Sequence, residues 1–101
     1  MSIEFDEDNL EEDSNRIIDL IDESRLDEAE AGAKKLMIDY PEVHDGLERL
    51  AMVYESRGDV KKAVEMYQEA LRFVASSNNH GEDLDEFLNF YKTKIKELSQ
   101  K

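Results

Sequence analysis

Cysteine is absent from this 101-residue chain, which excludes disulfides and thiolate metal sites. Proline occurs once, at Pro41, and the four scattered glycines form no glycine-rich phosphate loop. No apolar run approaches the roughly 20 residues that are needed to cross a bilayer. The first residues are acidic, whereas a secretory signal is basic and then apolar. We therefore expect a soluble, cytoplasmic protein.

Basic residues are also scarce, with 13 Lys and Arg against 26 Asp and Glu, for a formal net charge of −13. The charge is uneven, because residues 1–30 hold thirteen acids and only two arginines, a local net of −11. Such a field repels nucleic acid and anionic membranes, so neither is an expected partner.

Apolar residues recur at helical spacing over most of the chain, and no segment alternates as a strand would. The chain is long enough for one domain only. We therefore predict an all-α fold, with an acidic mobile arm at 1–9 and a single domain at 10–98. Five helices are predicted: one from about Asn9, one over Leu26 to Tyr40, one around Leu47 to Tyr54, one over Val60 to Ala75, and one over Glu82 to Leu98.

A sequence period relates Leu26-Asp27-Glu28-Ala29 to Val60-Lys61-Lys62-Ala63. Its length, about 34 residues, is that of a two-helix solenoid repeat. Segment 47–75 resembles a tetratricopeptide repeat, although Ala75 stands where the family has proline. The residues that carry the resemblance are Leu47, Leu50, Ala51, Tyr54, Gly58, Asp59, Ala63, Tyr67, Ala70 and Leu71.

The resemblance implies an α-α superhelix of two helical hairpins and a C-terminal capping helix. Repeat one would span about 13–41, repeat two about 44–77, and the capping helix about 82–98. Repeat one is degenerate, since Asp13 and Arg16 stand where large apolar residues are expected, and Gly32-Ala33 replace bulkier side chains. In repeat two, Ala51 and Ala63 would allow close helix packing.

In tetratricopeptide-like arrays the first helix of each hairpin lines a concave groove. Chaperone-binding members hold a C-terminal carboxylate with basic residues, but Ser14, Ile18 and Glu48 occupy those positions here, so we reject that ligand. An acidic groove with an apolar floor instead fits a basic, amphipathic polypeptide segment. The groove positions carried over by offset are Ser14, Ile18, Ile21, Asp45, Glu48, Met52, Glu55, Asp85 and Asn89.

The resemblance therefore implies a non-catalytic adaptor or chaperone-like module without cofactors. Two alternatives stay open. Ile18 and Ile21 belong to the core in one of them, and the acids are then only a solvated face. In the other, the chain is an obligate homo-oligomer whose groove is filled by its own N-terminal arm or by a second copy, with Phe73 and Phe90 as self-association contacts.

Three further signals are set aside. A calcium loop that began at Asp6 would need glycine at its sixth position, which is Glu11. His44 and His80 lie beside Asp45 and Asp83, and we expect both to be surface residues, since no paired-histidine zinc spacing exists. Without a nucleophile motif or a phosphate loop, we expect neither an enzyme nor a metal site.

Overall fold

The computed structural model describes residues 10–76 and 84–100, and this part of the chain is all-α, as the sequence predicts. The predicted arm at 1–9 and the loop containing His80 lie outside the described residues. The helices are α1 (Leu10–Asp22), α2 (Leu26–Asp39), α3 (Asp45–Ser56), α4 (Val60–Ser76) and α5 (Leu84–Ser99).

The helix ends follow from local chemistry. Helix α2 ends at Asp39, just ahead of Pro41, because proline cannot continue a helix and restricts the residue before it. Gly58 adopts a left-handed conformation, with φ of 79°, in the turn after α3. The carboxylate of Asp59 then accepts a hydrogen bond from the backbone N–H of Lys62 at 3.2 Å, which caps α4.

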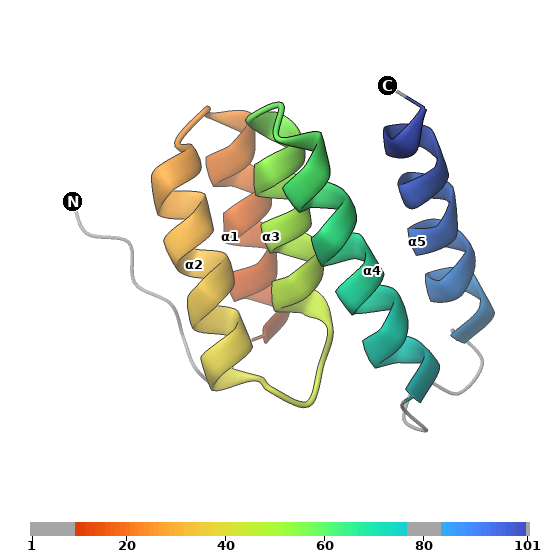
Figure 1. Ribbon diagram of the computed structural model, residues 1–101. Coiled ribbons are helices and arrows are strands. Elements are labelled where there is room, and N and C mark those ends of the chain that lie inside the picture. The colour runs from red at the N-terminus through yellow and green to blue at the C-terminus, as the bar shows by residue number, and fades with distance from the viewer. Residues whose placement is uncertain (1–9, 77–83, 101) are drawn as a thin grey trace.

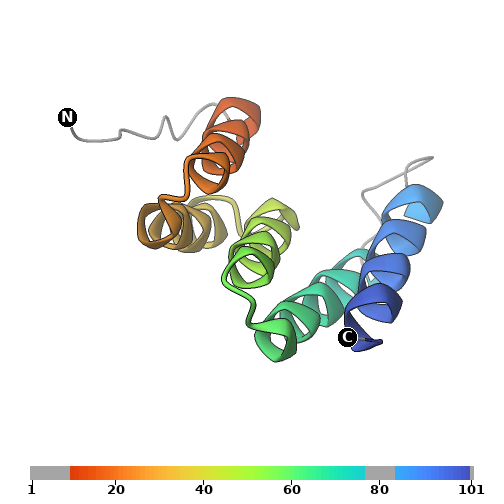
Figure 2. The same ribbon diagram turned by 90° about the horizontal axis from the view of Figure 1, so that it is seen from above.

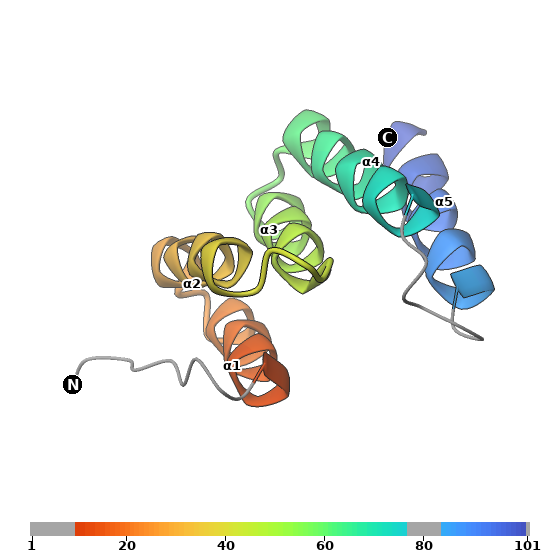
Figure 3. The ribbon, with the colours of Figure 1, turned by 90° about the horizontal axis from the view of Figure 1, so that it is seen from below.

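The helices form two rows. In Figure 1, α1, α3 and α5 run in one direction, while α2 and α4 run in the other. Seen from above, the chain zigzags, with α1, α3 and α5 along one side and α2 and α4 along the other (Figure 2). The view from below shows the same division (Figure 3). We call the surface formed by the first row the α1/α3/α5 face.

The core consists of two clusters that meet at α3. The first joins α1, α2 and α3, and the second joins α3, α4 and α5. Tyr54 and Met66 pack against both clusters, so Tyr54 fills the space between the hairpins. Ala51 and Ala63 are fully buried in the second cluster, where small side chains permit close helix packing.

The two hairpin turns use the same backbone hydrogen bonds, one sequence period apart. Arg25 N donates to Leu20 O at 2.8 Å, and Asp59 N donates to Tyr54 O at 2.9 Å. Ser24 and Gly58, which both have positive φ, also occupy equivalent positions. The sequence period is therefore a structural period. Three further pairs of bonds match in the same way: Glu23 to Asp19 with Arg57 to Val53, Ser24 to Ile21 with Gly58 to Glu55, and Ala29 to Arg25 with Ala63 to Asp59.

Candidate functional site

The side chain of Arg49 joins α3 to α1. Its Nε donates a hydrogen bond to the backbone carbonyl of Ser14 at 3.3 Å, and its Nη1 lies 2.5 Å from Glu48 Oε2 and 3.3 Å from Met52 Sδ. Ile18 lies one turn beyond Ser14, and Met52 about one turn beyond Arg49. Helices α1 and α3 run in the same direction, so both apolar residues follow the contact of Arg49 with Ser14 along their helices.

A chain of hydrogen bonds joins α3 to α5. The hydroxyl of Tyr91 donates to Glu48 Oε1 at 2.8 Å and lies 2.5 Å from His44 Nδ1. A hydroxyl has one hydrogen, so when it points to Glu48 the Nδ1 of His44 is the donor. Burial raises the pKa of the Tyr91 phenol, and the nearby charge of Glu48 raises it further.

The position of His44 corrects the prediction that this residue lies on the surface. Its side chain is only 7% exposed, and its ring packs edge-on against Phe87, with centroids 4.4 Å apart. The imidazole thus lies inside the contact between α3 and α5. His44 therefore helps to hold α3 and α5 together. Its position beside Asp45 in the sequence gave no indication of this role.

A second carboxylate, that of Glu55, lies further along the same contact. The hydroxyl of Tyr67 donates to Glu55 Oε1 at 2.9 Å, and Lys94 Nζ lies 3.2 Å from Glu55 Oε2. Burial raises the pKa of the Tyr67 phenol, and Glu55 raises it further. The Tyr67 phenol therefore stays protonated and remains a hydrogen-bond donor.

An open hollow of about 500 Å³ lies beside Glu55, between α3, α4 and α5. Its lining combines the apolar side chains of Met52 and Phe90 with the charged side chains of Glu55 and Lys94. Phe90 is 43% exposed, and its ring lies edge-on to that of Tyr67, with centroids 6.4 Å apart. The residues that line the hollow are Met52, Glu55, Ser56, Tyr67, Phe90 and Lys94.

The structure gathers only part of the predicted groove. Met52 and Glu55 line the hollow, while both carboxylate oxygens of Glu48 are engaged inside the protein. Ser14 is buried, so its side chain offers no contact surface. The remaining predicted positions do not line the hollow: Ile18 and Ile21 on α1 and Asp45 at the start of α3 are half-buried, and Asp85 and Asn89 on α5 are exposed.

The groove prediction missed four residues of the hollow: Ser56, Tyr67, Phe90 and Lys94. Of these four, Tyr67 and Lys94 contact Glu55 directly. Their separation from Glu55 in the sequence, 12 residues for Tyr67 and 39 for Lys94, leaves no local signal for the contact.

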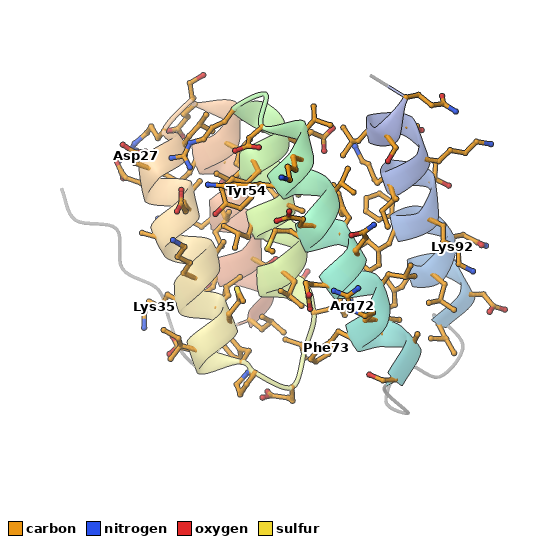
Figure 4. The ribbon with its side chains drawn as sticks, in the orientation of Figure 1. Asp27, Lys35, Tyr54, Arg72, Phe73 and Lys92 are labelled. Carbon is orange, nitrogen blue, oxygen red and sulfur yellow. The ribbon has the colours of Figure 1, made fainter. Side chains whose placement is uncertain are left out.

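The two predicted self-association residues do not share a face. Phe90 faces the hollow through its contact with Tyr67. Phe73 lies six residues after Tyr67 on α4, which turns its side chain about 120° away around the helix. Figure 4 shows Phe73 near the C-terminal end of α4, on the side of the α2–α3 connection.

The outer surface of α1 is acidic. A shallow hollow there is lined by Glu11, Glu12, Asn15, Arg16 and Asp19, on the side opposite the buried residues of this helix. Across residues 10–76 and 84–100, no three potential metal ligands converge. None of the described helices combines the length and the apolar character of a membrane span.

Comparison of the chain with protein-family models, with curated proteins and with solved structures found no match.

Proposed function

We propose that the protein is a non-catalytic protein–protein interaction module, an adaptor or chaperone, that captures a polypeptide segment on its α1/α3/α5 face. The observation that carries this proposal is the hollow between α3, α4 and α5. Phe90 is one of three large apolar side chains that are exposed in the described part of the chain, and it forms a wall of this hollow together with Met52. An apolar side chain of a partner would be buried there.

The arrangement of the helices supports this proposal. Two hairpins with matching turns, followed by a single helix with a polar outer side, are what a short tetratricopeptide-like superhelix requires. Such arrays use the row of first helices to bind extended or helical segments. We therefore propose that fold type for this chain and place the ligand along α1, α3 and α5.

The charge of the protein favours a basic partner. The formal net charge is −13, and five carboxylates on α1 are opposed by Arg16 alone. Opposite charge accelerates encounter and selects against acidic segments. Within the hollow, however, Glu55 and Lys94 offset one another, so its apolar walls supply contact area and the acidic surface of α1 supplies the preference for a basic segment.

A homo-oligomer is the alternative, and one observation favours it. Ile38 is 78% exposed on α2, beside the partly exposed Met37. An exposed apolar pair of this kind suits a self-contact. The charge of −13 opposes it, because two copies of the chain repel each other at low salt.

The proposal is tested by NMR titration with two capped amphipathic peptides of about 16 residues, long enough for roughly four helical turns. Both carry the same leucine face, and their polar faces are basic in one and acidic in the other. The basic peptide is expected to shift the amide signals of Met52 and Phe90, and Met52→Glu is expected to remove its binding. Ile38→Glu on α2, where the side chain is 78% exposed, is the matched control and should bind normally.

The two functions give different outcomes in this experiment. Binding of neither peptide would overturn the proposed capture. A dimer in sedimentation that dissociates on Ile38→Glu would instead support the oligomer. Sedimentation at low and high salt separates the two further, because salt weakens capture of a basic segment and relieves repulsion between copies.

A further inference from the structure

We propose that Glu55 recognises an arginine side chain of the captured segment, and that Lys94 occupies the same position until the arginine displaces it. This inference rests on the proposed function and names the chemistry of its partner. The segment would carry an arginine about one helical turn from an apolar side chain, so that both reach the hollow together.

Glu55 is held in place before any ligand arrives. The hydroxyl of Tyr67 donates to Glu55 Oε1 at 2.9 Å, and the Tyr67 side chain is fully buried. A carboxylate that is fixed by a buried donor does not need to be ordered when it binds a cation. Its second oxygen, Oε2, faces the cation of Lys94.

Lys94 makes a weak contact with this carboxylate. Its Nζ lies 3.2 Å from Oε2 and 3.4 Å from Oε1, whereas charge-assisted hydrogen bonds are typically about 2.7–2.9 Å long. Both side chains are 28% exposed, so solvent screens the pair. A cation with better geometry can therefore replace the lysine.

Elsewhere in the protein, a second carboxylate binds both a tyrosine hydroxyl and an arginine. Glu48 accepts a hydrogen bond from Tyr91 on one oxygen at 2.8 Å, and its other oxygen lies 2.5 Å from Arg49. Glu55 has the matching tyrosine, Tyr67, but its second oxygen pairs with a lysine at 3.2 Å instead of an arginine. The pair of Arg49 and Glu48 is also more buried, with side-chain exposures of 13% and 18%.

The hollow provides room for a guanidinium and its stem. Its volume of about 500 Å³ adjoins Glu55, with Phe90 and Met52 beside it. A guanidinium can lie against an aromatic ring while it binds a carboxylate, and its methylenes pack on apolar side chains. An ammonium group lacks this planar geometry, so arginine is preferred to lysine.

Neither a second copy nor the N-terminal segment is a suitable occupant. Residues 1–9 contain four acids and no basic residue, and the whole chain carries a net charge of −13. Both would bring negative charge to Glu55. A basic segment of another protein is the occupant to which the charge distribution points.

The test uses the capped basic peptide in a form with one arginine at the edge of its leucine face, and matched peptides in which lysine, glutamine or glutamate replaces it. Affinities are measured by calorimetry. Glu55→Gln is expected to weaken binding of the arginine peptide by at least about tenfold, which is the usual loss for a hydrogen bond to a charged group. Lys94→Met should tighten it about threefold or more, because the competing cation is gone.

Lys92→Met is the matched control. It removes the same charge from α5, and Figure 4 shows Lys92 on the side of α5 that faces away from α4. If Lys92→Met tightens binding as much as Lys94→Met, the effect comes from the overall charge of α5. The proposal that arginine displaces Lys94 would then be overturned. The glutamine peptide should bind equally to the wild type and to Lys94→Met.

The outcomes also separate this inference from the proposed function. Binding of the arginine peptide that is unchanged in Glu55→Gln would reject the arginine site and leave capture intact. Binding of the glutamate peptide that is lost in Lys94→Met would assign the site to an anion instead. If no peptide binds to the wild type or to Lys94→Met, both proposals fail. Circular dichroism of each variant confirms that it is folded.

Discussion

Ser24 and Gly58 occupy equivalent turns of the two hairpins, and both adopt a left-handed backbone, with φ of 61° and 79°. Glycine adopts this conformation without steric cost, whereas a residue with a Cβ is strained there by roughly 1–2 kcal/mol. The first hairpin thus carries at Ser24 a strain that the second avoids.

Ser24→Gly is therefore expected to stabilise the protein by up to about 1 kcal/mol, because relief of the strain exceeds the greater freedom of glycine in the unfolded chain. Urea unfolding followed by circular dichroism measures this change. Gly58→Ala is the reverse control. An added Cβ at Gly58 meets nothing within 4 Å, so the expected loss of about 1 kcal/mol would come from the backbone alone. If Ser24→Gly instead destabilised the protein, the backbone at Ser24 would not be strained as we infer.

Tyr91→Phe is expected to destabilise the protein by about 1–3 kcal/mol, since it removes the hydroxyl that joins His44 to Glu48 and leaves buried polar atoms without this partner. The measurement is the urea midpoint at neutral pH. A double-mutant cycle with Glu48→Gln isolates the shared hydrogen bond. Additive effects of the two substitutions would show that this bond contributes nothing to the contact between α3 and α5.

Alkaline pH is expected to destabilise the fold through Tyr67 and Tyr91. Burial raises both phenol pKa values, so the unfolded chain releases protons near pH 10 while the native state keeps them. Their contribution is fully present below about pH 10 and is lost as the pH rises toward the folded pKa values, with a limiting slope of about 1.4 kcal/mol per pH unit for each group. Urea unfolding from about pH 8 to 11, which brackets the unfolded pKa, measures the slope. In Tyr91→Phe the slope of the unfolding free energy against pH should fall by the contribution of one phenol. A slope equal to that of the wild type would show that Tyr91 does not contribute to the pH dependence.

The helices and their turns were predictable from the sequence because their signals are local. The predicted starts at Leu26 and Val60 are those of α2 and α4, and Gly58 is the residue type that the left-handed turn after α3 favours. The period between Ala29 and Ala63 likewise reappears in the turn hydrogen bonds. Each of these features depends on a few neighbouring residues.

The contacts between α3 and α5 were not predictable in the same way. The pair of His44 and Tyr91 is separated by 47 residues, and that of Glu55 and Lys94 by 39. A change of one residue in the register of α5 would bring different side chains to α3. The helical pattern of α5 indicates which face is buried but does not indicate this register, so the burial of His44 and the partner of Glu55 emerged only from the structure.

Gly46 permits a close approach of α3 to α2. A Cβ added at this glycine would lie 2.5 Å from Met37 Cγ, 2.9 Å from the backbone N of Met37 and 3.0 Å from the carbonyl oxygen of Ala33. Two of these three atoms belong to the backbone of α2, which cannot move aside as a side chain can. No local sequence signal indicates this role for Gly46, because its effect depends on a neighbouring helix.

Gly46→Ala is therefore expected to destabilise the protein by about 1–3 kcal/mol, the usual cost of overpacking, even though alanine is the better helix former by about 1 kcal/mol. Urea unfolding measures the loss. Combining it with Met37→Ala removes the side-chain clash but leaves the two backbone clashes. Gly46→Ala should therefore still destabilise the Met37→Ala variant, but by less than it destabilises the wild type. If Gly46→Ala cost no stability in the Met37→Ala background, the side chain of Met37 alone would set the distance between α2 and α3. A stabilised Gly46→Ala variant would mean that the helices can separate without cost, since only then would the gain in helix propensity prevail.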